Sequence, residues 1–113
     1  MESCQNASRS EGISVYIIDI DGTICNTNGL DYANAVPIMY NIEKFNNLFD
    51  NGNTVIYWTS RGVKTGIDHH ALTRNQLERW GVKYSELWMN KPYYDFWIDD
   101  KCRHISEFLK GKI

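Results

Sequence analysis

The sequence predicts an α/β domain, a Rossmann-like three-layer sandwich in which helices cover both faces of a central parallel sheet. Apolar, β-prone runs alternate along the chain with segments of helical periodicity, which is the pattern of βαβ units. The strongest runs are continuously apolar, as is typical of strands buried on both faces. Because the chain has only 113 residues, we expect a single domain with one core, at residues 13–113.

The first half of the chain supplies one strand and one helix. Residues 1–12 are polar and are expected to form a flexible leader, and the first strand follows at residues 15–18, which read VYII. A helix is expected from Pro37, a favoured first helical residue, until Asp-Asn-Gly at residues 50–52 stops it. Its apolar stripe has spacings of four, three and four residues: Ile38, Ile42, Phe45 and Phe49.

The second half repeats the alternation. A strand is predicted at residues 54–58, a helix from Asp68 to Trp80 that Gly81 closes, and a short strand at residues 86–89. A third strong strand is expected at residues 96–98, which read FWI. A terminal helix follows, with an inner face made of Cys102, Ile105, Phe108 and Leu109.

Most of the aromatic residues, which make up 13% of the chain, are expected in the core. Trp58 and Trp97 fall in predicted buried strands, and Trp80 falls at the inward end of a helix. Tyr93 and Tyr94 are the exceptions, because they follow a loop lysine and could face a ligand.

Composition and charge exclude several classes of protein. The 12 basic and 14 acidic side chains give a net charge of −2, which argues against nucleic acid as a partner. No apolar run approaches the roughly 20 residues of a membrane span, so no membrane partner is expected. The N-terminus lacks a signal-peptide segment, and the three cysteines form no CxxC pair, which fits the reducing cytoplasm.

Polar side chains gather where the predicted strands end. Asp19 and Asp21 follow the first strand, and Thr59 follows the second. Asp99 and Asp100 follow the third. Since parallel strands bring their carboxyl ends to one edge of the sheet, these groups are expected to share a site with the loop residue Lys91. A single aspartate at a strand end is more often a cap, but the whole set of acids requires a hard cation, and we expect Mg²⁺.

Four segments resemble the motifs of the haloacid dehalogenase superfamily. Residues 16–23, YIIDIDGT, resemble the first motif, an apolar strand followed by DxDGT, and residues 55–62, VIYWTSRG, resemble the second. Lys91-Pro92 resembles the third motif, and residues 96–100, FWIDD, resemble the fourth. The motifs occur in the family's order, and the resemblance covers residues 13–109.

The resemblance implies a phosphatase with an aspartyl-phosphate intermediate. Asp19 would be the nucleophile, with a pKa held low by Mg²⁺ and Lys91. Asp21 would be the general acid and then the base, with its main-chain carbonyl on the metal. Thr59 would donate a hydrogen bond to a phosphoryl oxygen, and Lys91 would neutralise charge there.

Three assignments stay open at this point. Asp99 is the better candidate for the next metal ligand, with Asp100 bound directly or through water, and the sequence does not separate them. Ser60 would replace Thr59 if the strand ended one residue later. Arg61 would either reach the phosphate or substrate, or lie on the surface as a solvated arginine.

The resemblance also implies an open site. Residues 22–35 leave room for a short flap only, so no cap domain is expected, and either a second copy of the chain or a large substrate would cover the pocket. We expect Asn26, Thr27, Asn28, Asp31 and Tyr32 of this flap to set specificity. The expected substrate is a small phosphorylated metabolite such as a sugar phosphate.

Two other functions are compatible with the residue types. One is a phosphatase acting on a polynucleotide end, which the missing basic groove argues against. The other is a phospho-accepting receiver module used in signalling, which would also combine acids, a threonine and a lysine. In that module adjacent acids come first and the phosphorylated aspartate later, whereas DxDGT comes first in this chain.

Overall fold

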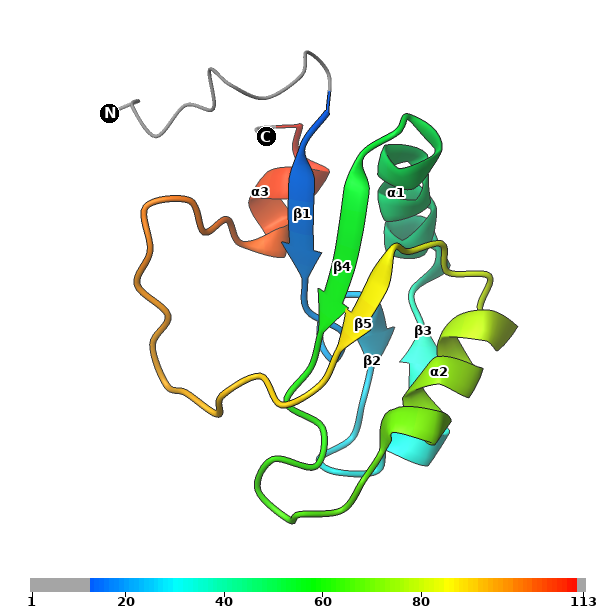
Figure 1. Ribbon diagram of the computed structural model, residues 1–113, viewed down its shortest axis with the longest axis vertical. Helices are drawn as coiled ribbons and strands as arrows, with labels where there is room; N and C mark the ends of the chain where they lie inside the picture. Colours follow the sequence, from blue (N-terminus) through cyan, green and yellow to red (C-terminus); the bar gives the residue numbers. More distant parts are fainter. Residues whose placement is uncertain (1–12, 112–113) are drawn as a thin grey trace.

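A computed structural model describes residues 13–111 of the chain. Three parallel strands form its central sheet in the order β1-β4-β5 (Figure 1), namely β1 (Val15–Ile18), β4 (Thr54–Trp58) and β5 (Glu86–Trp88). All three strands were predicted, which confirms the α/β class and the parallel sheet. The leader predicted at residues 1–12 lies outside the described residues.

The register of the sheet brings the ends of β1 and β4 together. Ile18 of β1 stands opposite Tyr57 of β4, and Trp58 of β4 stands opposite Trp88 of β5. The next residue after β1, Asp19, and the next after β4, Thr59, therefore leave the sheet at the same edge. This edge carries the candidate site.

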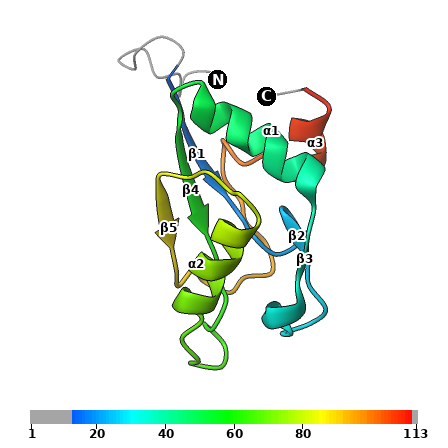
Figure 2. The same ribbon diagram turned by 90° about the vertical axis from the view of Figure 1, so that its right-hand side faces the viewer.

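Helices pack on one face of the sheet. α1 (Met39–Asp50), α2 (His70–Arg79) and α3 (Ile105–Leu109) follow the strands along the chain, and Figure 2 shows α1 and α3 on the same side. One core cluster joins them: Ile18, Ile20, Ile24, Cys25, Ile42, Phe45, Val55, Tyr57, Leu77, Trp80 and Val82. Phe108 of α3 is stacked on Phe45 of α1, with 4.8 Å between ring centroids.

The opposite face has no helix over it in the described part of the chain. The side chains of Val15 and Ile17 are 46% and 54% exposed there, although the continuous apolar run predicted burial on both faces. The described residues thus form one layer of helices against the sheet, and they do not supply the second layer of the expected sandwich.

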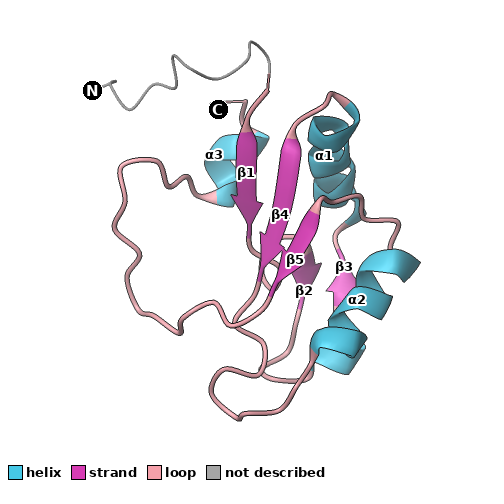
Figure 3. Cartoon of the chain, viewed as in Figure 1, coloured by secondary structure: helices cyan, strands magenta, loops and turns pink. Residues whose placement is uncertain are grey.

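The prediction of a strand at residues 96–98 is wrong. These residues have no regular structure, and Phe96 and Ile98 are 84% and 94% exposed (Figure 3, pink loop). Trp97, expected in a buried strand, is 40% exposed. A β-prone segment becomes a strand only where it finds a neighbouring strand to pair with, and residues 96–98 do not pair with the described sheet, whose order is β1-β4-β5.

Two smaller differences concern helix boundaries and the terminal helix. Pro37 belongs to a strand, because β2 (Cys25–Asn26) and β3 (Val36–Pro37) pair as a hairpin and α1 begins only at Met39. Ile105 and Phe108 pack on the core as predicted, whereas Cys102 is exposed and precedes the helix. Asn51 and Gly52, with φ of 93° at the glycine, end α1 where expected.

The hairpin and a 3-10 helix at Tyr32–Asn34 make up the short flap that was expected after the first motif. No cap domain occurs among the described residues. Within that part of the chain, no helix is both long and apolar enough to span a membrane.

Candidate active site

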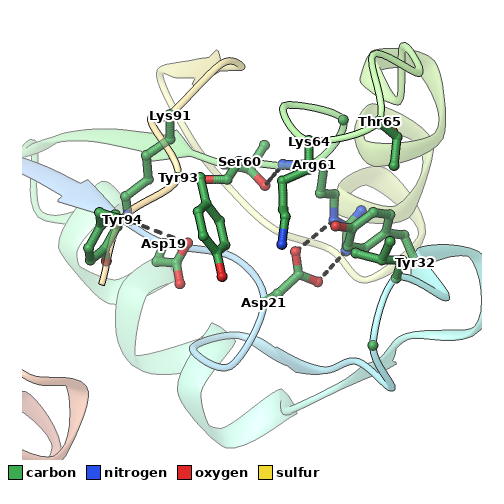
Figure 4. Close-up of a pocket in the computed structure, with 14 residues that line it drawn as sticks. Asp19, Asp21, Tyr32, Ser60, Arg61, Lys64, Thr65, Lys91, Tyr93 and Tyr94 are labelled. Atoms are coloured by element: carbon green, nitrogen blue, oxygen red, sulfur yellow. Dashed lines mark hydrogen bonds and ion pairs between the residues drawn. The ribbon is translucent and has the colours of Figure 1, made fainter. Parts of the chain in front are cut away.

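A pocket of about 400 Å³ lies at the carboxyl ends of the three strands. Its lining comes from four places: the segment after β1, the flap, the loop after β4 and the loop after β5 (Figure 4). This lining contains nine of the residues that were predicted to act at the site or to face a ligand, namely Asp19, Asp21, Tyr32, Thr59, Ser60, Arg61, Lys91, Tyr93 and Tyr94.

Asp19 faces Lys91 across the pocket. The Lys91 Nζ lies 3.6 Å from Asp19 Oδ1, and the Asp19 side chain is 39% exposed. Burial raises the pKa of Asp19, and the opposing charge of Lys91 does not fully compensate, so the net direction is upward. Lys91 acts in the predicted direction, but it does not by itself give the low pKa that was expected for Asp19, because desolvation of the carboxyl outweighs it.

Asp21 is held by Arg61 through both carboxylate oxygens. Arg61 Nε donates to Oδ2 and Nη2 donates to Oδ1, each at 2.9 Å, and Thr27 also donates to Oδ1. Burial alone would raise the pKa of Asp21, but the hydrogen bonds from Arg61 and Thr27 outweigh it and lower the pKa.

Arg61 is buried beneath the pocket. It is only 3% exposed, so the interpretation as a solvated surface arginine is wrong. Its Nη1 donates to Gln76 Oε1 at 2.6 Å and to Thr73 Oγ1 at 3.1 Å, both on α2. Its guanidinium carbon also lies 4.9 Å from the centroid of the Tyr32 ring in the flap. One side chain thereby joins the strand ends, α2 and the flap.

Thr59 accepts hydrogen bonds from the backbones of the two basic residues, Arg61 and Lys91. Its Oγ1 accepts a hydrogen bond from the Arg61 backbone N–H at 3.1 Å, and its carbonyl accepts one from the Lys91 N–H at 2.9 Å. Ser60 also lines the pocket, but its hydroxyl donates to the Pro92 carbonyl at 3.4 Å. Thr59 is 1% exposed, which leaves its hydroxyl at the floor of the pocket.

Asp99 and Asp100 do not line this pocket. Both are exposed and lie in the irregular segment that follows β5, where the Lys101 N–H donates to Asp99 Oδ1 at 3.3 Å. Because residues 96–98 do not join the sheet, the sequence after them is not carried to its carboxyl edge. The structure therefore brings together two of the four predicted metal-ligating aspartates, Asp19 and Asp21.

Sequence reasoning missed the inward polar face of α2. Thr73 and Gln76 are 0% and 1% exposed, although polar side chains on a helix are expected to face solvent. Their spacing of three residues places them on the same side of the helix as Leu77, which was the available signal. Gln76 also donates from Nε2 to the Tyr32 carbonyl at 2.6 Å, so it ties the flap to the same network.

Comparison with known proteins supports the fold. A crystal structure of a structural-genomics target from Vibrio cholerae superposes with a TM-score of 0.77 and 28% sequence identity. The match covers 84% of this chain and 86% of the other. No protein-family model and no curated protein matches the sequence.

Loss of the buried ion pair of Arg61 and Asp21 should destabilise the protein much more than loss of the exposed pair of Lys83 and Asp50. Arg61→Met leaves the Asp21 charge desolvated without its partner, and we expect a loss of about 3 kcal/mol in the free energy of unfolding at pH 7. Lys83→Met is the control, because Lys83 and Asp50 form a pair with both side chains 50% exposed, and its loss should cost below about 1 kcal/mol. Urea denaturation measures both.

The pH dependence has a defined sign. The folded-state pKa of Asp21 lies below its ordinary value of 3.8, so the stability from the pair is present above that pH and is lost as the pH falls through the folded pKa. The penalty of Arg61→Met should therefore shrink at acid pH. Equal losses for Arg61→Met and Lys83→Met at pH 7 would contradict the buried pair.

Proposed function

We propose that the protein is a phosphomonoesterase of the haloacid dehalogenase type, without a cap, that forms an aspartyl-phosphate on Asp19. The single observation that supports this most is the shared pocket. A carboxylate with a lysine beside it, a second carboxylate held by an arginine and a threonine hydroxyl all face one cavity. These groups match what phosphoryl transfer requires, namely a nucleophile, a proton carrier and fixed positive charge.

The first step transfers the phosphoryl group to the enzyme. An Asp19 carboxylate oxygen attacks phosphorus, an aspartyl O–P bond forms, and the bond from phosphorus to the substrate oxygen breaks. That oxygen takes a proton from Asp21 and leaves as an alcohol. Lys91, 3.6 Å from Asp19, offsets the negative charge that the incoming phosphoryl group adds.

The second step returns the enzyme to its starting state. Asp21, now ionised, takes a proton from water, and the water oxygen attacks phosphorus. Inorganic phosphate leaves, and the Asp19 carboxylate is restored with a proton back on Asp21. Oδ2 is the better oxygen to carry that proton, since it accepts one hydrogen bond, from Arg61, whereas Oδ1 accepts from Thr27, Cys25 and Arg61.

Magnesium is proposed as the cofactor, and the donor set fits it in part. Asp19 and Asp21 supply the oxygen ligands that a hard cation prefers. Asp99 and Asp100 are the proposed further ligands, although neither lines the pocket in this structure. When bound, the cation would neutralise phosphoryl charge.

The proposed substrate is a small phosphorylated metabolite such as a sugar phosphate. The cavity of about 400 Å³ accommodates a molecule of that size, and aromatic side chains in its lining, Tyr32, Tyr93 and Tyr94, offer ring faces to a sugar. The short flap leaves the site accessible.

Asp19→Asn should reduce hydrolysis of p-nitrophenyl phosphate by at least about 1,000-fold, because the amide is no nucleophile toward phosphorus. Asp50→Asn, an exposed position on α1 outside the pocket, should keep the rate of the unchanged protein. The assay is release of nitrophenolate in the presence of Mg²⁺. Turnover retained in Asp19→Asn would remove Asp19 as the nucleophile.

The double substitution Asp99→Asn and Asp100→Asn tests the remaining ligands. If both acids serve the cation, the Mg²⁺ concentration for half-maximal hydrolysis should rise at least about tenfold. Asp95→Asn is the matched control, because Asp95 is an exposed acid of the same irregular segment. An unchanged Mg²⁺ midpoint in the double variant would show that the cation binds without these two residues.

A further inference from the structure

The pocket is lined by one basic side chain that the proposed chemistry does not use. Lys91 faces Asp19 at 3.6 Å, and Arg61 is paired with Asp21 at 2.9 Å. Lys64 also lines the pocket, yet none of the carboxylates in the described part of the chain forms an ion pair with it. Its positive charge is therefore available to a ligand.

A tight turn presents Lys64 to the pocket. Gly62 has φ of 87°, and a Cβ at that position would lie 2.1 Å from the Ile67 carbonyl oxygen, so the backbone crosses itself too closely for a side chain. The Gly62 carbonyl also accepts a hydrogen bond from the Gly66 N–H at 2.8 Å. Lys64 stands midway between these two glycines, and the turn fixes where its side chain begins.

Lys64 and Tyr93 form a pair at the mouth of the pocket. The Lys64 Nζ lies 4.2 Å from the centroid of the Tyr93 ring, and Figure 4 draws the two next to each other near the aspartates. Tyr93 is 60% exposed, so most of its surface is open to a ligand. Leu30 of the flap, also 60% exposed, contributes an apolar side chain to the same lining.

We propose that the pair of Lys64 and Tyr93 binds the alcohol part of the substrate and selects one that carries a second anionic group. This rests on the proposed phosphatase function, in which the phosphoryl group occupies the space beside Asp19, Thr59 and Lys91. The substrate class is then a phosphomonoester of a ring or chain alcohol that also bears a carboxylate or a further phosphate. The ring or chain of the alcohol contacts the Tyr93 side chain, and its carboxylate or second phosphate pairs with Lys64.

Matched phosphoesters test the selection. The ratio of kcat/KM for 6-phosphogluconate to that for glucose 6-phosphate measures preference for a carboxylate. The same ratio for fructose 1,6-bisphosphate against fructose 6-phosphate measures preference for a second phosphate. Lys64→Gln should lower at least one of these ratios about tenfold. Lys44→Gln is the control, because Lys44 lies 5.4 Å from the Tyr40 ring centroid in a similar pair that does not line the pocket.

The outcomes separate this inference from the function on which it rests. A ratio that falls in Lys64→Gln and stays unchanged in Lys44→Gln supports the subsite, and the pair of substrates affected identifies the anion. Hydrolysis by the unchanged protein with ratios that Lys64→Gln does not alter overturns the subsite and leaves the phosphatase standing. If the unchanged protein hydrolyses none of the esters with Mg²⁺ present, the proposed function fails and the subsite fails with it.

Discussion

The buried guanidinium of Arg61 is the group on which the rest of the site depends. A positive charge at 3% exposure requires compensation, and Asp21 provides it through two parallel hydrogen bonds. The Nη1 group donates to oxygens of Thr73 and Gln76 on α2, Nη2 also donates to Cys25 Sγ at 3.9 Å, and the Tyr32 ring packs near the guanidinium. Since these partners come from separate parts of the chain, tertiary contacts fix the position of Asp21 together with the local hydrogen bond from Thr27.

This arrangement distinguishes the two aspartates that follow β1. Asp19, desolvated and opposed by one lysine at 3.6 Å, has a raised pKa, whereas Asp21, clamped by Arg61, has a lowered one. The proposed chemistry requires Asp21 to be protonated in the first step. The negative charge of a bound phosphoester would offset the positive charge of Arg61 and so favour the protonated form of Asp21. The flap shares in this balance, because Gln76 connects Arg61 to the Tyr32 carbonyl.

Much of the fold could be predicted because strand and helix periodicity is local. The runs at β1 and β4 were continuous and apolar, and the polar residues at their ends fell into the pocket because parallel strands share an edge. Burial of Arg61 could not be predicted, since its partners Thr73 and Gln76 lie on a helix that reads as polar. Residues 96–98 have strand propensity, but whether such a segment pairs depends on the tertiary structure around it. Because it does not pair here, Asp99 and Asp100 lie outside the pocket.

The most direct measurement is to locate the phosphoryl group during turnover. The protein would be mixed with a phosphoester and Mg²⁺, quenched in acid within milliseconds, digested and analysed by mass spectrometry for peptides that have gained a phosphoryl group. Our account predicts an acid-stable, base-labile adduct on Asp19, absent from Asp19→Asn. Phosphate found on another side chain, or steady hydrolysis with no covalent adduct at any quench time, would contradict it.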